Sequence, residues 1–588
     1  MKLSVNRNII WCDLFVQRLA DLGVHYVCIS PGSRSTSLTL AFSSNAKIKT
    51  FSIVDERSSA FFALGLAKKT QTPVAIVTTS GTAVAELYPA IIEAFYRRIP
   101  LIICTADRPS VLYNKGANQT INQRNIYKNH IRYFANAGLP DLKKLPYVKK
   151  LAEDAIRFSI YDDMGPVHLN FPFEKPFEPK TYTDIVDVKL IEKVFTNSSF
   201  VLPAQKQPGI NFDSLAKKFS KIERGLIIAS VNLYDKNFPT LLSKFSKLLG
   251  YPVYIDGSSS LRFGNKKNIN VIDNLTALVR AKDFQKYFDP DLIIQFGSTP
   301  IANVLLEFFK KSRAEKILVN EFGDRNDPSL TAKTILKIDP SEFCESIIQS
   351  SKNKNGRDSC WLIDYNVMNN IAEELKKKII IGAQFPFEGR IATELISSLP
   401  DNSNLMVSNS LPIRDIDFFV SKNNKKIHVY TNRGASGIDG INSTALGIAK
   451  ASKEPTYLLI GDLAFFHDFN GIYNAVKYKI PLKIVLINNS GGGIFESLPI
   501  ARYRQFFKEK FSTPLELDFS KLVKAYGCQF IRIQNWKELN QKLSSSAGKK
   551  ILSVFEIKTD AKKSRLLREK YWMSVANKID SYINEIIS

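Results

Sequence analysis

Two side chains that could bind a metal ion, Asp462 and Asn489, each follow a short apolar stretch in the last third of the chain. The stretches 457–460 and 482–487 are typical of buried strands, and residues 469–478 suit a helix that crosses between parallel neighbours. Because parallel strands present their carboxyl ends at one sheet edge, both side chains are expected to reach the same crevice. With a backbone carbonyl of the glycine-rich turn that follows, their oxygen atoms predict a Mg²⁺ site.

An isolated Gly-Asp pair more often belongs to an ordinary β-α-β unit, in which the polar residues only cap turns. The spacing favours the metal site, because 24 residues (464–487) separate Gly461-Asp462-Leu463 from Asn488-Asn489. This arrangement resembles the cofactor-binding signature of thiamine-diphosphate-dependent enzymes. The third glycine of that signature is Leu463 here, which leaves the metal ligands intact and indicates one subgroup of the superfamily.

The composition is that of a globular protein with room for roughly three domains: 588 residues, 44% of them hydrophobic and 23% charged. No apolar run approaches the roughly 18 residues of a membrane span, and the first residues lack the apolar core of a signal peptide. The six cysteines are scattered without a C-x-x-C pair, so neither a zinc site nor a disulfide framework is indicated. We therefore expect a cytoplasmic protein without a membrane span.

The formal net charge of +25 raises the question of nucleic-acid binding. The lysines, however, are spread over the whole chain, and no basic segment is interleaved with aromatic residues as a single-strand binder requires. We therefore expect no nucleic-acid partner. A basic surface would instead attract small anionic molecules.

The two ends of the chain carry related sequences. Residues 63–73 and 445–455 are identical at six of eleven positions, at an offset of 382. In both copies a proline leads into an apolar stretch, VAIVT in the first and TYLLI in the second, and a further helix and a proline-led strand follow. Tandem repeats of solenoids recur every 20–50 residues, so the much longer offset predicts two related α/β domains with an insertion between them.

The predicted fold class is α/β, with three Rossmann-like domains built on parallel sheets, over residues 1–185, 205–350 and 380–588. The middle domain is marked by four apolar stretches that alternate with helical patterns, at 226–229, 253–255, 292–296 and 317–319. After Lys562 the chain is expected to form a peripheral helix.

A second group of residues that could take part in a reaction is Asp55-Glu56-Arg57, between an expected strand at 50–54 and an expected helix at 58–69. Acidic residues are common at helix starts because the helix dipole favours them, so a structural role for one of the two acids is an alternative. Glu56 lies in the first copy of the repeat, whereas the metal ligands lie in the second. Thiamine catalysis needs a carboxylate away from the diphosphate, where it hydrogen-bonds the aminopyrimidine ring. A dry site would raise the pKa of that carboxylate.

Over most of its length the chain resembles the 2-succinyl-5-enolpyruvyl-6-hydroxy-3-cyclohexene-1-carboxylate (SEPHCHC) synthases, a family of thiamine-diphosphate-dependent enzymes. The resemblance rests on the segments 30–36 (SPGSRST), 55–57 (DER), 79–82 (TSGT), 106–109 (ADRP), 116–119 (GANQ), 432–440 (NRGASGIDG), 461–463 (GDL) and 488–495 (NNSGGGIF). It implies the thiamine diphosphate-binding fold, with a pyrimidine-binding first domain and a diphosphate-binding third domain.

The resemblance also implies the cofactors and the reaction. Thiamine diphosphate and Mg²⁺ or Mn²⁺ would be bound, and the substrates would be 2-oxoglutarate and isochorismate. The enzyme would be a transferase that decarboxylates 2-oxoglutarate and adds the resulting succinyl carbanion to isochorismate in menaquinone or phylloquinone biosynthesis.

Both substrates are dicarboxylates, and arginine binds carboxylates in bidentate fashion, although any single arginine is more often part of a surface ion pair. By position in the family motifs, the implied catalytic and substrate-binding residues are Ser33, Arg34, Glu56, Arg108, Asn118 and Gln119 from the first domain, and Ser410, Arg414 and Arg433 from the third. The implied cofactor-binding residues are Glu56 and Asn118 of the first domain and Ser410, Ile438, Gly461, Asp462, Asn489, Ile494 and Phe495 of the third, with Asp462, Asn489 and the Gly491 carbonyl as metal ligands.

The middle domain departs from the family pattern. Where the family has a lysine or a basic pair after a Gly-x-x-Pro turn, this chain has Ala302 and Asn303. Lys310 and Arg262 are candidates to replace the missing charge.

Two other functions are open. An acetolactate-synthase-like or 2-oxoacid-decarboxylase-like enzyme would share Glu56, Asp462 and Asn489 but lack the arginine set. A nucleotide-binding regulator could be suggested by Gly434, Gly437 and Gly440, but their spacing is not G-x-G-x-x-G.

The expected carboxylate and metal site lie on different domains, so the cofactor would bridge an interface. In the superfamily that interface joins two chains. We therefore expect a homodimer or homotetramer with active sites at the subunit interface.

Overall fold

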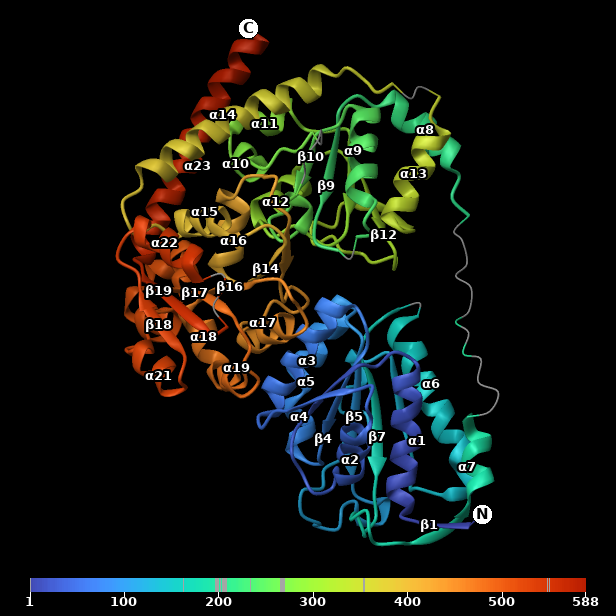
Figure 1. Cartoon of the computed structure of the whole chain (residues 1–588). Helices are drawn as coiled ribbons and strands as arrows, with labels where there is room; N and C mark the ends of the chain where they lie inside the picture. The colour runs from blue at the N-terminus through green and yellow to red at the C-terminus, as the bar shows by residue number, and fades with distance from the viewer. Residues whose placement is uncertain are drawn as a thin grey trace.

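The computed structural model describes residues 2–588 except 162, 196–199, 201, 203–208, 233, 265–269, 353–354, 547 and 549. Three parallel sheets, each covered by helices, form the three parts of the molecule, so the α/β prediction is confirmed (Figure 1). None of the described helices combines the length and apolarity that a bilayer span requires.

The first sheet has six parallel strands in the order β3-β2-β4-β5-β7-β6. Its strands are β2 (Tyr26–Ile29), β3 (Lys49–Ser52), β4 (Val74–Thr78), β5 (Leu101–Asp107), β6 (Tyr133–Asn136) and β7 (Val167–Pro172). The helices of this part are α1 (Arg7–Asp21), α2 (Thr36–Ser44), α3 (Glu56–Thr70), α4 (Thr82–Glu86), α5 (Tyr88–Arg97) and α6 (Leu145–Ile160). Strand β1 (Lys2–Val5) pairs with β8 (Asp184–Asp187) in an antiparallel ribbon, which α7 (Val188–Phe195) follows.

The last sheet has the order β15-β14-β16-β17-β19-β18, which is the same arrangement when strands are numbered within each sheet. The prediction that the two ends are copies of one domain is therefore supported by topology. Its strands are β14 (Ser403–Val407), β15 (Ile427–Tyr430), β16 (Thr456–Gly461), β17 (Lys483–Asn488), β18 (Gln529–Arg532) and β19 (Ser553–Lys558). Its helices are α15 (Glu388–Ser398), α16 (Leu411–Phe419), α17 (Ile441–Lys450), α18 (Asp462–His467), α19 (Tyr473–Lys477), α20 (Arg504–Phe507), α21 (Phe519–Ala525) and α22 (Trp536–Ser546). The expected crossover helix is a 3₁₀ turn, η5 (Phe469–Ile472), followed by α19.

The middle sheet has five parallel strands in the order β10-β9-β11-β12-β13. They are β9 (Gly225–Ala229), β10 (Val253–Ile255), β11 (Leu292–Phe296), β12 (Glu315–Asn320) and β13 (Ala332–Lys337), so the four predicted strands are confirmed and a fifth is added. The helices are α8 (Phe212–Lys221), α9 (Phe238–Leu249), α10 (Leu275–Leu278), α11 (Lys282–Tyr287), α12 (Asn303–Lys311) and α13 (Pro340–Ser350).

The last helix of the chain, α23 (Ala561–Ile587), is not peripheral, contrary to the prediction. It runs beside α14 (Cys360–Gly382), as Figure 1 shows. Tyr571, Val575 and Ile579 are buried in one apolar core with residues of α14 and the middle sheet. Their spacing of four positions places them on one helix face, which explains why this helix packs inward.

The first and third parts meet through helices α3 and α17, which face each other in Figure 1. A Cβ atom added at Gly65 of α3 would lie 2.1 Å from the Thr444 carbonyl oxygen, and one at Gly447 of α17 would lie 2.1 Å from the Phe62 carbonyl oxygen. Only glycines permit this close approach. The contact joins the apolar residues of both parts into one core.

Candidate active site

The carboxyl ends of β14, β16 and β17 enclose a cavity of about 170 Å³, here called the strand-end pocket. Strands β16 and β17 are parallel neighbours, with Gly461 paired to Ile487, so Asp462 and Asn489 emerge together at this edge. The prediction that these two side chains reach the same crevice is therefore confirmed. The predicted residues that line the pocket are Ser410, Ile438, Gly461, Asp462, Asn489, Gly491, Ile494 and Phe495.

Asp462 is the first residue of α18 and is almost fully buried. Its Oδ1 accepts a hydrogen bond from the Leu463 backbone N–H (2.9 Å) and its Oδ2 accepts one from the Gly491 N–H (2.7 Å). Burial raises the pKa of this carboxyl to about 6, against the two hydrogen bonds, which favour the charged form, and the nearby Glu388 carboxylate adds to the rise. The pocket thus contains a buried carboxyl group whose charged form a bound cation would favour.

Asn489 lies beside Asp462, and only the NH₂ group of its side-chain amide has a hydrogen-bond partner in the part of the chain that the structure describes. Its Nδ2 donates to Glu388 Oε1 at 3.0 Å, while its Oδ1 is buried without a hydrogen-bond donor among the described residues. A buried carbonyl oxygen without a hydrogen-bond partner is uncommon, and this one is available as an acceptor or ligand atom. An amide oxygen, a carboxylate and nearby backbone carbonyls are donors that suit Mg²⁺, so the residues fit the expected metal.

The described residues contain no group of three or more His, Cys, Asp or Glu side chains that could hold a metal ion. A cation in the strand-end pocket would therefore depend on the amide and on backbone carbonyls besides Asp462. A small number of protein ligands suits Mg²⁺, which fills its remaining coordination positions with water and phosphate oxygens.

The glycines after Asn489 allow the turn to close over the pocket. Gly491 has φ +129°, and a Cβ there would lie 2.0 Å from the Ser512 carbonyl oxygen. A Cβ at Gly493 would lie 2.5 Å from Asn489 Nδ2. Side chains at either position would displace the turn or the amide, so the glycine-rich segment is required by the geometry of the site.

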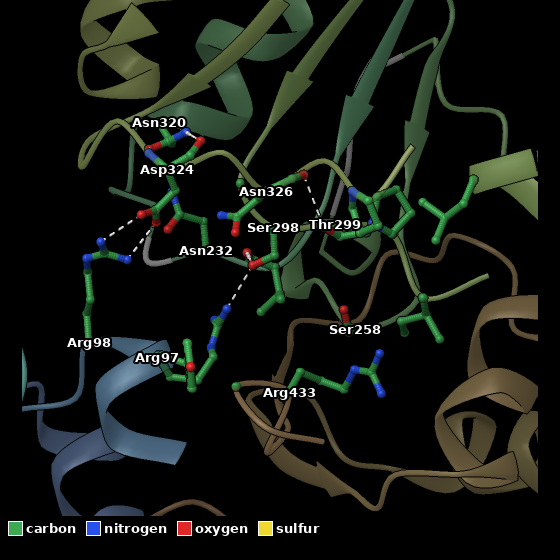
Figure 2. Close-up of a pocket in the computed structure, with 18 of the residues that line it drawn as sticks. Arg97, Arg98, Asn232, Ser258, Ser298, Thr299, Asn320, Asp324, Asn326 and Arg433 are labelled. Carbon is green, nitrogen blue, oxygen red and sulfur yellow. Dashed lines mark hydrogen bonds and ion pairs between the residues drawn. The ribbon is translucent and has the colours of Figure 1, made fainter. Parts of the chain in front are cut away.

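A second cavity of about 380 Å³, here called the basic cavity, lies where all three parts of the chain meet (Figure 2). Arg414 and Arg433, two of the implied substrate-binding residues, line it from the third part, and Arg97 and Arg98 line it from the end of α5. Arg97 Nη1 donates to Ser298 Oγ at 2.8 Å, and Arg98 forms two bonds to the Asp324 carboxylate, of 2.6 and 2.8 Å.

Arg414 and Arg433 are both partly buried, and burial lowers the pKa of each guanidinium. Arg414 Nη1 donates to the Ser410 carbonyl at 2.6 Å, and Arg433 Nη1 donates to Asn409 Oδ1 at 3.3 Å. Asn409 therefore links the strand-end pocket, which it lines, to an arginine of the basic cavity. These cations retain donors that could bind carboxylates.

Neither Lys310 nor Arg262 replaces the basic residues that the family has at the positions of Ala302 and Asn303. Arg262 is fully buried, and its guanidinium is bonded to Asp417 and to backbone carbonyls, so it cannot reach a substrate. Asn303 lines the basic cavity, whereas Lys310 is exposed and is not among its lining residues. Arg97 and Arg98, which were not expected from the sequence, also line this cavity; the charge of Arg98 is balanced by Asp324, so the added positive charge is that of Arg97. Their only sequence signal is a pair of arginines at a helix end before a proline-led strand.

The predicted residues of the first domain gather at the carboxyl edge of its own sheet. A Cβ at Gly32 would lie 2.3 Å from Thr79 Cβ, and one at Gly81 would lie 3.3 Å from the Gln119 carbonyl oxygen, so the three loops converge. Burial and then the neighbouring Arg108 lower the pKa of Arg34. Ser33, Asn118 and Gln119 are exposed.

Glu56 is the first residue of α3, and the preceding Asp55 caps the helix by accepting from the Ser58 N–H at 2.9 Å. The capping hydrogen bond is thus made by Asp55, while Glu56 lies in the first turn, where the helix dipole also favours an acidic residue. Burial and then the charges of Asp55 and Glu86 raise the pKa of Glu56.

The structure does not unite the two predicted halves of the site within one chain. In the described part of the chain, Glu56 and the predicted first-domain residues line neither the strand-end pocket nor the basic cavity. The residues left outside are Ser33, Arg34, Glu56, Arg108, Asn118 and Gln119.

Residues that the sequence analysis missed also include Glu388, Ser408 and Asn409, all of which line the strand-end pocket. Asn409 lies directly before Ser410, so its place in the loop after β14 was a usable signal. Glu388 had no sequence signal, because it lies at the start of α15, far in sequence from the motifs that contain Asp462 and Asn489.

Family models of three kinds match the chain along its length. They are "Thiamine pyrophosphate enzyme, N-terminal TPP binding domain" at residues 11–126, "Middle domain of thiamine pyrophosphate" at 199–407, and "Thiamine pyrophosphate enzyme, C-terminal TPP binding domain" at 419–557.

Curated relatives are similar over nearly the whole chain, and those described here are named 2-succinyl-5-enolpyruvyl-6-hydroxy-3-cyclohexene-1-carboxylate synthase. The protein of Bacillus cytotoxicus is 38% identical over 565 residues, which cover 95% of each chain. The protein of Geobacillus kaustophilus is 36% identical over 97% of this chain and 98% of the relative. That of Trichodesmium erythraeum is 36% identical over 94% and 96%.

Among solved structures, benzoylformate decarboxylase from Polynucleobacter necessarius has a similar fold. The TM-score is 0.68, with 94% of this chain and 98% of that chain covered, at 16% sequence identity. At this identity the likeness concerns the fold alone.

Proposed function

This chain belongs to the SEPHCHC synthase family of thiamine diphosphate enzymes, and we propose that it decarboxylates 2-oxoglutarate and transfers the succinyl unit to isochorismate. The product would enter menaquinone or phylloquinone biosynthesis. The observation that carries the site assignment is the strand-end pocket, where the buried Asp462 carboxylate lies beside the unpartnered Asn489 Oδ1.

Asp462, Asn489 and the Gly491 carbonyl would hold Mg²⁺ or Mn²⁺, and through it the diphosphate. Thiamine diphosphate, when bound, supplies the electron sink that stabilises the negative charge left by decarboxylation. Ile438, Ile494 and Phe495 give the pocket apolar walls that exclude water.

Glu56 is proposed to hold a proton at the pyrimidine ring. A general acid or base works best when its pKa lies nearer the working pH than that of an exposed carboxyl. The raised pKa of Glu56, caused chiefly by burial, is in the required direction. Closure of the site by another chain would bury it further and raise the pKa more.

The arginines are proposed to bind the carboxylates of the two substrates. Arg414 and Arg433 would act from the basic cavity, and Arg34 and Arg108 would act from the first-domain loops with Ser33, Asn118 and Gln119. Their guanidinium groups can form paired hydrogen bonds with a carboxylate, which lysine cannot.

We propose that the active enzyme is a homodimer or a dimer of dimers. Within one chain Glu56 does not line the strand-end pocket, so a second copy would bring the two halves together. Large apolar side chains are exposed on both halves: Val54 (70%) and Val111 (73%) near the first-domain residues, and Tyr503 (63%) after the glycine-rich turn. A subunit interface would cover such side chains.

A cytoplasmic location is proposed on the basis of the cysteines. Five of the six are buried thiols, and all six are unpaired, as is usual in a reducing compartment.

The substrate assignment is tested by following carbon dioxide release from 2-oxoglutarate and from pyruvate, each with and without isochorismate. We expect release from 2-oxoglutarate, with a stable adduct formed only when isochorismate is present. Preference for pyruvate would instead indicate an enzyme of the acetolactate synthase type. Thiamine diphosphate should be recovered when the loaded protein is denatured.

A further inference from the structure

Glu388 is a fully buried carboxylate (0% exposed) at the first position of α15, behind the amide of Asn489. Its Oε1 accepts from Asn489 Nδ2 at 3.0 Å and from Thr559 Oγ1 at 2.9 Å. Its Oε2 accepts from Arg568 Nη2 at 2.6 Å. Every described partner of this carboxylate is a donor, as an ionised acid requires.

The carboxylate determines which way the Asn489 amide faces. An ionised carboxylate can only accept hydrogen bonds, so the NH₂ end of the amide must point to Glu388. The Oδ1 end is then the one left without a donor. A neutral amide in place of Glu388 could also donate, and would accept either orientation.

Arg568 of α23 keeps Glu388 in place. Its Nη2 also bonds to Asp415 Oδ2 at 2.7 Å, and its Nε bonds to Asp415 Oδ1 at 2.8 Å. All three charged side chains are buried. Buried charges are tolerated only when paired and hydrogen-bonded, and a guanidinium held by two carboxylates cannot easily rotate.

We propose that Glu388 is a positioning residue, which aims the Asn489 carbonyl oxygen at the metal, and that the C-terminal helix supports it through Arg568. The inference rests on the proposed function, since it needs a metal ion at Asp462 and Asn489. It assigns a role in the metal site to two residues that lie outside all of the cofactor-binding motifs.

The test is the substitution Glu388→Gln, which preserves the shape but allows the Asn489 amide to turn. Loss of an outer hydrogen-bond partner weakens metal affinity by about 10–100-fold in comparable sites. We expect a Kd for Mg²⁺ that is weaker by this factor, measured by isothermal titration with thiamine diphosphate present. The melting temperature of the metal-free protein should change little, and excess Mg²⁺ should restore kcat.

Glu394→Gln is the matched control, because Glu394 lies on the same helix and bonds to Arg390 and Asn540, away from the pocket. Its Mg²⁺ affinity should equal that of the wild type. If Glu388→Gln also binds Mg²⁺ like the wild type, the positioning role is wrong while the proposed function stands. If the wild-type protein binds no Mg²⁺ with thiamine diphosphate, the proposed metal site itself fails.

Thr559→Val provides a second variant in case Glu388→Gln does not fold. It removes one of the two donors to Glu388 Oε1 and leaves all charges unchanged. We expect a smaller weakening of Mg²⁺ binding in the same direction. An unchanged Kd would then overturn the inference.

Discussion

Burial raises the pKa of two carboxyl groups in the proposed site, and the two shifts serve different ends. Burial raises the pKa of Asp462 to about 6, and a divalent ion bound there would lower it and keep the acid ionised. No cation is proposed beside Glu56, so its raised pKa would favour the protonated form, whose proton could be shared with a ligand. The effect of burial would thus be opposed at the proposed metal site and used at the proposed proton-transfer site.

At the residue scale we predict that Glu56→Gln keeps thiamine diphosphate binding but lowers kcat by about 100-fold or more, since an amide cannot exchange the proton. Steady-state product formation and cofactor titration measure the two effects. Asp55→Asn is the control, because asparagine caps helices as well as aspartate does. Wild-type kcat in Glu56→Gln would remove this residue from the mechanism.

Among the elements, the approach of α3 to α17 joins the half of the chain that carries Glu56 to the half that carries the proposed metal ligands. The contact depends on two glycines and on hydrogen bonds across it. Asp468 follows α18 and accepts from the Ser443 N–H of α17 at 2.7 Å and from the Ser58 Oγ of α3 at 3.2 Å.

Gly65→Ala is predicted to lower the melting temperature, because its Cβ would lie 2.1 Å from the Thr444 carbonyl oxygen and would force the helices apart. Overpacking of this kind costs about 1–3 kcal/mol. Gly382→Ala is the control, since no atom lies within 4 Å of a Cβ at that position. Equal melting temperatures for the two variants would contradict the packing argument.

The pH dependence of stability should reflect Asp468. Burial raises its pKa from 3.8 to about 6, so the folded protein holds this proton more tightly than the unfolded chain does. Its contribution is therefore present at low pH and is lost as the pH rises towards and past 6. From pH 5 to 7 the loss amounts to about 1 kcal/mol. Asp468→Asn should remove this part of the slope in melting temperature against pH, and parallel profiles would argue against it.

In the molecule as a whole, the first-domain residues of the proposed site do not line the pocket that the third-domain residues form. The third-domain half is a formed pocket, whereas the first-domain half is a set of exposed loops. Such a division suits an assembly in which each site takes one half from each chain.

Mixing two inactive variants tests this assembly. In a hybrid of Glu56→Gln with Asn489→Ala, one of the two shared sites would contain both wild-type residues. Random exchange of subunits should therefore restore about a quarter of the wild-type activity. Sites built within single chains would remain inactive after mixing. Sedimentation of the wild type should show a dimer or a larger assembly.

The features of this protein that depend on local spacing could be predicted from its amino-acid sequence. Asp462 and Asn489 could be placed at one sheet edge because each follows an apolar strand in a single β-α-β unit. The self-similarity between 63–73 and 445–455 predicted two related domains, and the sheets at the two ends have the same strand order.

Contacts between elements that are distant in sequence became visible in the folded structure alone. Glu388 and Arg568 are 180 positions apart, and no periodicity within α15 or α23 indicates that they meet behind Asn489. The same holds for Arg262, which is buried in an ion pair, and for Arg97 and Arg98, which line the basic cavity. A strand can be recognised from the types and spacing of neighbouring residues. A buried charge pair depends on how whole helices pack together, which the residues near either partner in the sequence do not indicate.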